Sequence, residues 1–130
     1  MRRRARMDPK ARQLALAIGA TRMALGASIL FATRPALRGM GFGRTDASGE
    51  ALAKLGGGRD LALAAMTLAA RDDRQALRSV ILVSGACDAA DAVTLGLSAS
   101  RPETRQAGIG GILAGSGAAA ACLWIWRRLS

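Results

Sequence analysis

The sequence contains no histidine, no tyrosine and only two cysteines among its 130 residues. Metal sites for zinc, iron and copper are built mainly from histidine and cysteine side chains. Cys87 and Cys122 lie far apart in different apolar stretches and form neither a CxxC motif nor a metal-binding spacing. We therefore predict no metal, no dithiol chemistry and no cofactor. Both cysteines are interpreted as small apolar residues in lipid or at a helix contact.

Aromatic residues make up only 3% of the chain, although its formal net charge is +10. Nucleic-acid-binding proteins cluster basic residues on one face, often beside aromatic rings that stack on bases. Here the arginines mostly flank apolar stretches, which is the placement favoured by anionic lipid and the positive-inside rule. Nucleic acid is therefore excluded as an expected partner, whereas the bilayer and its anionic head groups are expected partners.

Long apolar stretches are abundant, and residues 107–126 form 20 consecutive positions without a charge. As a helix this segment measures about 30 Å, the thickness of the hydrocarbon core of a bilayer. A helix of a soluble bundle would need a polar face, and this segment has none. The sequence therefore predicts an all-α, polytopic integral membrane protein with one domain.

Four spans are predicted, at residues 13–33, 51–70, 79–99 and 107–126, after a basic tail at residues 1–12. The first is expected to end at Arg34-Pro35, because proline cannot continue the helical hydrogen bonds. A polar segment at residues 36–50 follows, with Thr45-Asp46 as a helix cap. The second span has a clean apolar core only at residues 61–70, so a re-entrant or interfacial helix is the alternative there.

The basic N-terminus followed by an apolar run also has some features of a signal peptide. However, the run is about 20 residues long, contains Arg22 near its middle and lacks a convincing cleavage site. We interpret it as a retained first span. The sequence leaves both Met1 and Met7 as candidate first residues.

The orientation follows from the distribution of lysine and arginine. The N-terminal tail, the turn near residues 71–78 and the C-terminus together carry 11 of these residues, whereas the other two loops carry 6. The positive-inside rule therefore predicts a four-helix bundle with both termini in the cytoplasm. At the C-terminus, Trp124, Trp126, Arg127 and Arg128 have the order of an interface anchor.

Helices associate in lipid mainly through small residues that allow close contact. The last span has Gly111 and Gly115 in a GxxxG pair, within a stripe completed by Ala107 and Ala119. A stripe is also predicted on the first span (Ala20, Ala24, Ser28, Ala32), and another on the third (Ser84, Asp88, Ala92, Gly96).

Charged residues within the spans are the candidate site, and we name them the charged cluster: Arg22, Arg59, Asp60, Asp88 and Asp91. A charge at a helix centre costs about 2.5–3.5 kcal/mol on insertion scales. In the third span the two aspartates cost about 5–7 kcal/mol, against about 3–4 kcal/mol recovered from apolar residues. Asp88 and Asp91 share a helix face, so one of them is expected to hold a proton near neutral pH.

Three interpretations of the charged cluster are open. It forms an ionic clasp that holds the helices in register, it lines a polar pocket for a proton, ion or small polar head group, or its charges reach the membrane surface separately. A dry cluster in which Arg22 or Arg59 contacts the aspartates directly favours the clasp. A water-reaching cavity lined by Asp88 and Asp91 favours binding or transport.

Two motifs carry a resemblance to a known family. Residues 22–26 (RMALG) precede Arg34-Pro35, and residues 58–63 (GRDLAL) precede a helix that bears aspartates. This order resembles small bacterial four-helix membrane proteins of DoxX-like type, over residues 13–126. Such proteins often have glycine where this chain has Ala64-Ala65. The resemblance implies a multi-pass protein of the bacterial inner membrane with no established reaction, although related proteins have been linked to quinone-dependent redox systems.

Three functions are considered on this basis. The first is a non-enzymatic accessory or assembly protein whose partners include a second copy or another membrane protein. The second is a small transporter or proton-coupled binding protein that uses Asp88 and Asp91, with a ligand that the sequence does not identify. The third is a component of a membrane redox system, which the absence of histidine ligands and of a nucleotide-binding motif disfavours.

Overall fold

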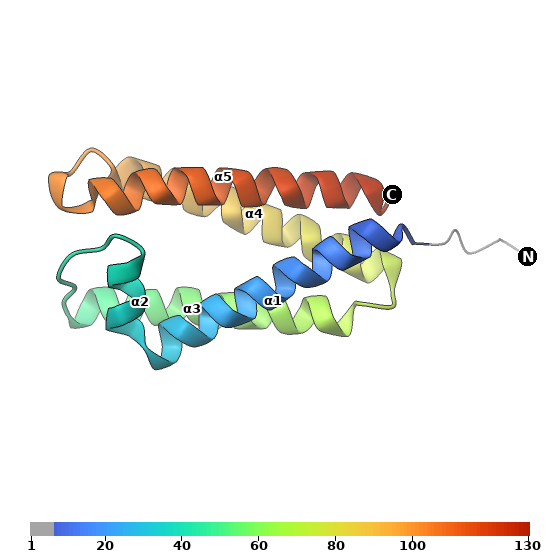
Figure 1. Ribbon diagram of the computed structural model, residues 1–130, viewed down its shortest axis with the longest axis horizontal. Helices are drawn as coiled ribbons and strands as arrows, with labels where there is room; N and C mark the ends of the chain where they lie inside the picture. Colours follow the sequence, from blue (N-terminus) through green and yellow to red (C-terminus); the bar gives the residue numbers. More distant parts are fainter. Residues whose placement is uncertain (1–6) are drawn as a thin grey trace, which may run out of the picture.

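A computed structural model describes residues 7–130, and within them every regular element is helical (Figure 1). The all-α prediction is thus confirmed for this part of the chain. Residues 1–6 of the predicted basic tail lie outside the described residues. The elements are α1 (Pro9–Phe31), α2 (Thr33–Gly39), α3 (Ala47–Ala69), α4 (Arg74–Ser98), η1 (Pro102–Thr104) and α5 (Arg105–Arg128).

Three long helices begin at an aspartate that caps their free backbone N–H groups. Asp8 accepts a hydrogen bond from the backbone of Lys10 at the start of α1, and Asp46 accepts one from Gly49 at the start of α3. Asp73 accepts from the backbone N–H groups of two residues in the first turn of α4. The predicted cap at Asp46 is confirmed, and the same chemistry sets the start of α1, α3 and α4.

The first span was predicted to run to residue 33, just before Arg34-Pro35, and this end is wrong by two residues. Helix α1 ends at Phe31, and the break is Ala32, whose φ and ψ of −135° and 49° are not helical. Pro35 lies in the first turn of α2 instead. Proline is tolerated there because the N–H groups of a first turn have no helical acceptor.

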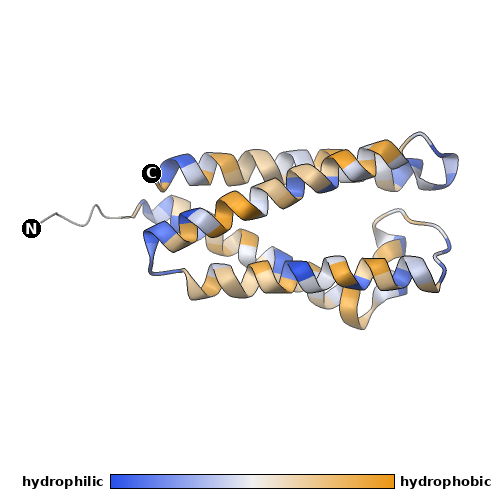
Figure 2. Ribbon diagram, turned by 180° about the vertical axis from the view of Figure 1, so that it is seen from behind, coloured by the Kyte–Doolittle hydropathy of each residue, from blue (hydrophilic) through white to orange (hydrophobic). Residues whose placement is uncertain are grey.

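Within residues 7–130, three segments are long and apolar enough to cross a membrane: α1, α4, and η1 together with α5 (Pro9–Phe31, Arg74–Ser98 and Pro102–Arg128). This is the pattern of a membrane protein. Helix α3 is not among them, because Lys54, Arg59 and Asp60 interrupt its apolar sequence. It is nevertheless one unbroken helix of 23 residues that runs through all three consecutive glycines. Figure 2 shows a hydrophilic patch midway along it.

The long helices form two pairs, α1 with α3 and α4 with α5, each joined by glycine contacts. A Cβ atom on Gly26 would lie 2.6 Å from the carbonyl oxygen of Gly57, so these two backbones touch. On α5, a Cβ atom on Gly115 would lie 2.8 Å from the carbonyl oxygen of Asp88, and one on Gly111 would overlap Leu95. The GxxxG pair therefore lies in the α4–α5 contact, where close approach needs glycine.

The stripe predicted on the first span is wrong. Its four members (Ala20, Ala24, Ser28 and Ala32) are all exposed in the structure. The buried side of α1 is formed by different residues (Ala11, Ala15, Gly19, Arg22, Gly26 and Ile29). In an alanine-rich helix a repeat of four small residues arises by chance and does not by itself mark a contact. The observed contact face is fixed by Gly26 and by the side chain of Arg22.

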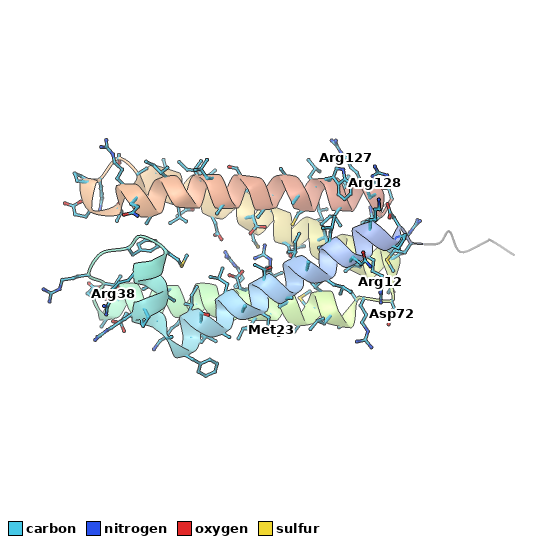
Figure 3. The ribbon with its side chains drawn as sticks, in the orientation of Figure 1. Arg12, Met23, Arg38, Asp72, Arg127 and Arg128 are labelled. Carbon is cyan, nitrogen blue, oxygen red and sulfur yellow. The ribbon has the colours of Figure 1, made fainter. Side chains whose placement is uncertain are left out.

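The two pairs meet at the end of the molecule that carries both termini, where α1 approaches α4 and α5 (Figure 1). A buried apolar core fills this end (Ala11, Ala15, Ala70, Leu77, Val80, Ile81, Cys122, Ile125, Leu129). Arg12 reaches across to the α3–α4 turn and pairs with Asp72 at 2.9 Å (Figure 3). Hydrogen bonds from Arg71 and Arg12 lower the pKa of Asp72, which keeps this surface pair ionised.

Replacing Gly115 by Leu is expected to weaken the α4–α5 pair, because the new side chain meets the backbone of α4. Overpacking of this kind costs about 1–3 kcal/mol. The control is Gly117→Leu on the same helix, where a Cβ atom meets nothing within 4 Å. The measurement is the temperature at which each purified variant loses its monodisperse state in mild detergent. Equal midpoints for the two variants would contradict this contact.

Candidate functional site

The structure brings all five residues of the charged cluster together, from three different helices. Arg22 of α1 lies at the centre, with its Nη1 donating to Asp60 Oδ1 of α3 and its Nη2 to Asp88 Oδ1 of α4, both at 2.6 Å. These side chains are nearly inaccessible, with exposed fractions of 9% for Arg22, 6% for Asp60 and 11% for Asp88. One guanidinium thus joins the α1–α3 pair to the α4–α5 pair.

Arg59 of α3 makes the second connection between the two pairs. Its two terminal nitrogens donate to both carboxylate oxygens of Asp91 on α4, at 2.9 and 2.6 Å. It also lies 3.7 Å from Asp60, its neighbour in sequence. Two-point bonding between guanidinium and carboxylate is strong and directional. The Arg59–Asp91 pair is less buried than the ion pairs of Arg22, since the side chains of Arg59 and Asp91 have exposed fractions of 37% and 39%.

Asp88 and Asp91 were expected to share a proton because they occupy one helix face. In the structure each carboxylate accepts hydrogen bonds from its own arginine, Asp88 from Arg22 and Asp91 from Arg59. The direct carboxylate pair that motivated the expectation is therefore replaced by two separate ion pairs.

Two further groups of the cluster were missed by the sequence analysis. The backbone carbonyl of Ser84 accepts a hydrogen bond from Arg22 Nη2 at 3.2 Å, and the Cys122 thiol lies 3.9 Å from Asp88 Oδ2. A backbone acceptor leaves no trace in side-chain chemistry, so no sequence signal points to Ser84. Cys122 was interpreted as a helix-contact residue, and it does lie buried against Gly85 in the α4–α5 contact.

A cavity of about 760 Å³ lies between α1 and α5, beside the charged cluster. We name it the α1–α5 cavity. Four charged side chains line it, namely Arg22, Asp60, Asp88 and Asp91. The rest of its wall is largely apolar (Leu14, Ala17, Ile18, Leu25, Met40, Leu95, Ala114, Ala118, Ala121, Trp124, Ile125). It exists because α1 contacts α5 much less than it contacts α3.

The structure holds part of the geometry that each interpretation of the charged cluster requires. Arg22 and Arg59 contact the aspartates directly, as an ionic clasp requires. Asp88 and Asp91 also line a cavity, as a binding site requires. The cluster connects the helix pairs on one side and faces open volume on the other.

The residues predicted as interface anchors lie in the last turns of α5, and Figure 3 shows Arg127 and Arg128 at the same end of the molecule as Arg12 and Asp72. The Arg128 guanidinium lies 5.2 Å from the ring centre of Trp124, and the Arg78 guanidinium of α4 lies 4.3 Å from that of Trp126. Trp124 in addition lines the α1–α5 cavity. It therefore contributes to the candidate site, which its position before Arg127 and Arg128 did not indicate.

Comparison of the chain with protein-family models, with curated proteins and with solved structures found no match in any of the three. The candidate site is therefore interpreted from its own geometry.

Replacing Arg22 by Gln should destabilise the fold by about 3–5 kcal/mol, because it leaves two buried carboxylates without their cation. Replacing Arg59 by Gln should cost less, since that pair is more exposed. The measurement is unfolding by increasing fractions of sodium dodecyl sulfate in mild detergent. Lowering the pH should restore part of the stability of Arg22→Gln, because protonation neutralises Asp60 and Asp88. A larger loss for Arg59→Gln would contradict the central role of Arg22.

Proposed function

We propose that this chain is a four-span integral membrane protein that binds a small amphipathic ligand in the α1–α5 cavity. The observation that carries the proposal is that a network of two arginines and three aspartates borders a mainly apolar cavity. The binding function, considered second from the sequence, is thereby favoured over a purely structural accessory role.

The four-span arrangement is supported by the length and partners of α3. Its 23 residues are enough to cross a bilayer, and the two charges near its middle, Arg59 and Asp60, are bonded to charges on other helices. Ion pairs between helices offset the cost that excludes isolated charges from lipid. A four-helix protein of the bacterial inner membrane is also what the DoxX-like resemblance implies.

Orientation with both termini in the cytoplasm is supported by the distribution of basic residues. The end of the molecule that carries the termini also carries Arg12, Arg127 and Arg128, whereas Arg38 lies at the opposite end (Figure 3). The positive-inside rule assigns the richer end to the cytoplasm.

The cavity has the properties of small-molecule sites in general. Its volume of about 760 Å³ falls within the usual range for such sites, and its wall combines apolar surface with a few converging polar groups. In a bilayer the natural ligands for such a wall are molecules already dissolved in lipid. We infer that the ligand enters sideways, between α1 and α5, with its polar end toward the charged cluster.

The topology is tested by reporter fusions. A reporter that is active only in the cytoplasm should be active when it is fused after Ser130, or when it is inserted in the turn after α3 at Asp72. The same reporter inserted after Gly43 or Glu103 should be inactive, because these positions fall at the opposite ends of the helices. Activity at Gly43 together with inactivity at Ser130 would contradict the proposed orientation.

Ligand binding is tested with the neutral amphipathic dye N-phenyl-1-naphthylamine, added to the protein in lipid nanodiscs. In a Trp126→Phe background, Trp124 is the sole tryptophan and reports on the cavity that it lines. Saturable energy transfer from Trp124 to the dye is expected. Ala118→Phe should reduce the binding about tenfold or more by filling the cavity, as the loss of a few kcal/mol of apolar contact implies.

The matched control is Ala120→Phe, which adds the same side chain to an exposed position of α5 outside the cavity wall. It should bind the dye as the parent protein does. Equal energy transfer in Ala118→Phe and Ala120→Phe, or no saturable transfer in the parent, would contradict a ligand site in this cavity.

A further inference from the structure

We infer that the ligand of the α1–α5 cavity is an amphipathic amine, bound as its ammonium ion by the aspartates of the charged cluster. This inference rests on the proposed function and adds the chemical class of the ligand. Three observations support it: the charge of the cluster, the hydrogen-bonding groups that remain free, and the apolar composition of the rest of the cavity wall.

The cluster has one negative charge more than it has positive charges. Its two arginines serve three aspartates, because Arg22 is shared between Asp60 and Asp88 while Arg59 is bound to Asp91. At the depth of a bilayer an unbalanced charge is costly, and it is compensated by a proton or by a cation. Arg59 does not line the cavity, so the cavity wall itself carries three carboxylates and one guanidinium.

The hydrogen-bonding groups that remain accessible to a ligand are mainly acceptors. Both terminal nitrogens of Arg22 already donate, to Asp60, Asp88 and the carbonyl of Ser84, and its Nε, which has no partner, is buried. Asp91 is the most accessible carboxylate of the wall, with 39% of its side chain exposed. Ionised carboxylates accept hydrogen bonds and donate none. A ligand must therefore bring donors, and an ammonium group brings donors together with the missing positive charge.

The remainder of the wall specifies an apolar body for the ligand. Leu14, Ile18 and Leu25 line the cavity from α1, and Trp124 lines it from α5. None of these side chains carries a charge. The ammonium group is thus expected at the cluster and the apolar part along α1 and α5.

The test is a competition series in which the apolar part of the probe is constant. 4-Phenylbutylamine, 4-phenylbutanol and 4-phenylbutyrate are each titrated against bound N-phenyl-1-naphthylamine, in nanodiscs of zwitterionic lipid at neutral pH. The amine should displace the dye at a concentration about tenfold lower than the alcohol, because its hydrogen bonds to carboxylate are charge-assisted. The butyrate should be the weakest of the three.

Two variants shift the charge of the cluster in opposite directions. Asp91→Asn removes the surplus negative charge and should reduce the preference for the amine over the alcohol to about threefold or less. Arg59→Gln makes the cluster more negative and should increase that preference. A purely structural role of these residues would change affinity for all three probes alike. Asp72→Asn, at the exposed turn outside the cavity, is the control and should leave the series unchanged.

Failure of the inference differs from failure of the proposed function. If the dye binds in the cavity but the butyrate competes as well as the amine, or Asp91→Asn keeps the full preference, the ligand class is wrong and the binding site stands. If the dye shows no saturable binding to the parent protein, the proposed function itself fails. Loss of the amine preference on acidification would agree with the inference, since protonated aspartates no longer attract an ammonium ion.

Discussion

The whole arrangement depends on one guanidinium group, that of Arg22, which lies between Asp60 and Asp88 and is almost completely buried. Within each helix pair, glycine contacts bring the backbones together, as Gly26 and Gly57 do for α1 and α3. Between the pairs, the apolar core is confined to the end that carries the termini. Lipid gives no hydrophobic drive for closing the remaining gap. The charge on Arg22 therefore provides the attraction that fixes how the two pairs face each other.

Much of this could be predicted because in lipid the cost of a buried charge is large and easy to recognise. Apolar stretches located the helices, and ionisable residues inside them identified the five members of the charged cluster. The cluster contains two arginines and three aspartates, and this near balance of opposite charges indicated that they pair with one another. The GxxxG pair of Gly111 and Gly115 also lies in a helix contact, as expected where two backbones approach closely in lipid.

The parts that could not be predicted depend on geometry without a sequence signal. Small residues occur both in the repeat from Ala20 to Ala32 and at the true contact, Gly26. The spacing of small residues alone could therefore not show which face of α1 is buried. The break at Ala32 arises from the path of the chain into α2, whereas Pro35 gave a misleading signal. The cavity results from the divergence of α1 from α5, which no local pattern encodes. For this reason the sequence indicated only an interface-anchor role for Trp124, from its position beside Trp126, Arg127 and Arg128, and not its place in the cavity wall.

The distribution of the five charges between the helix pairs has a consequence for biogenesis. The first pair carries Arg22, Arg59 and Asp60, with a net charge of +1, and the second carries Asp88 and Asp91, with a net charge of −2. Each helix pair by itself would place unpaired charges in the bilayer, which is unfavourable. Each pair supplies the opposite charges that the other one needs. Insertion by the translocon should consequently be completed only when both halves are present, so that a truncated nascent chain fails to integrate and is exposed to proteolytic quality control.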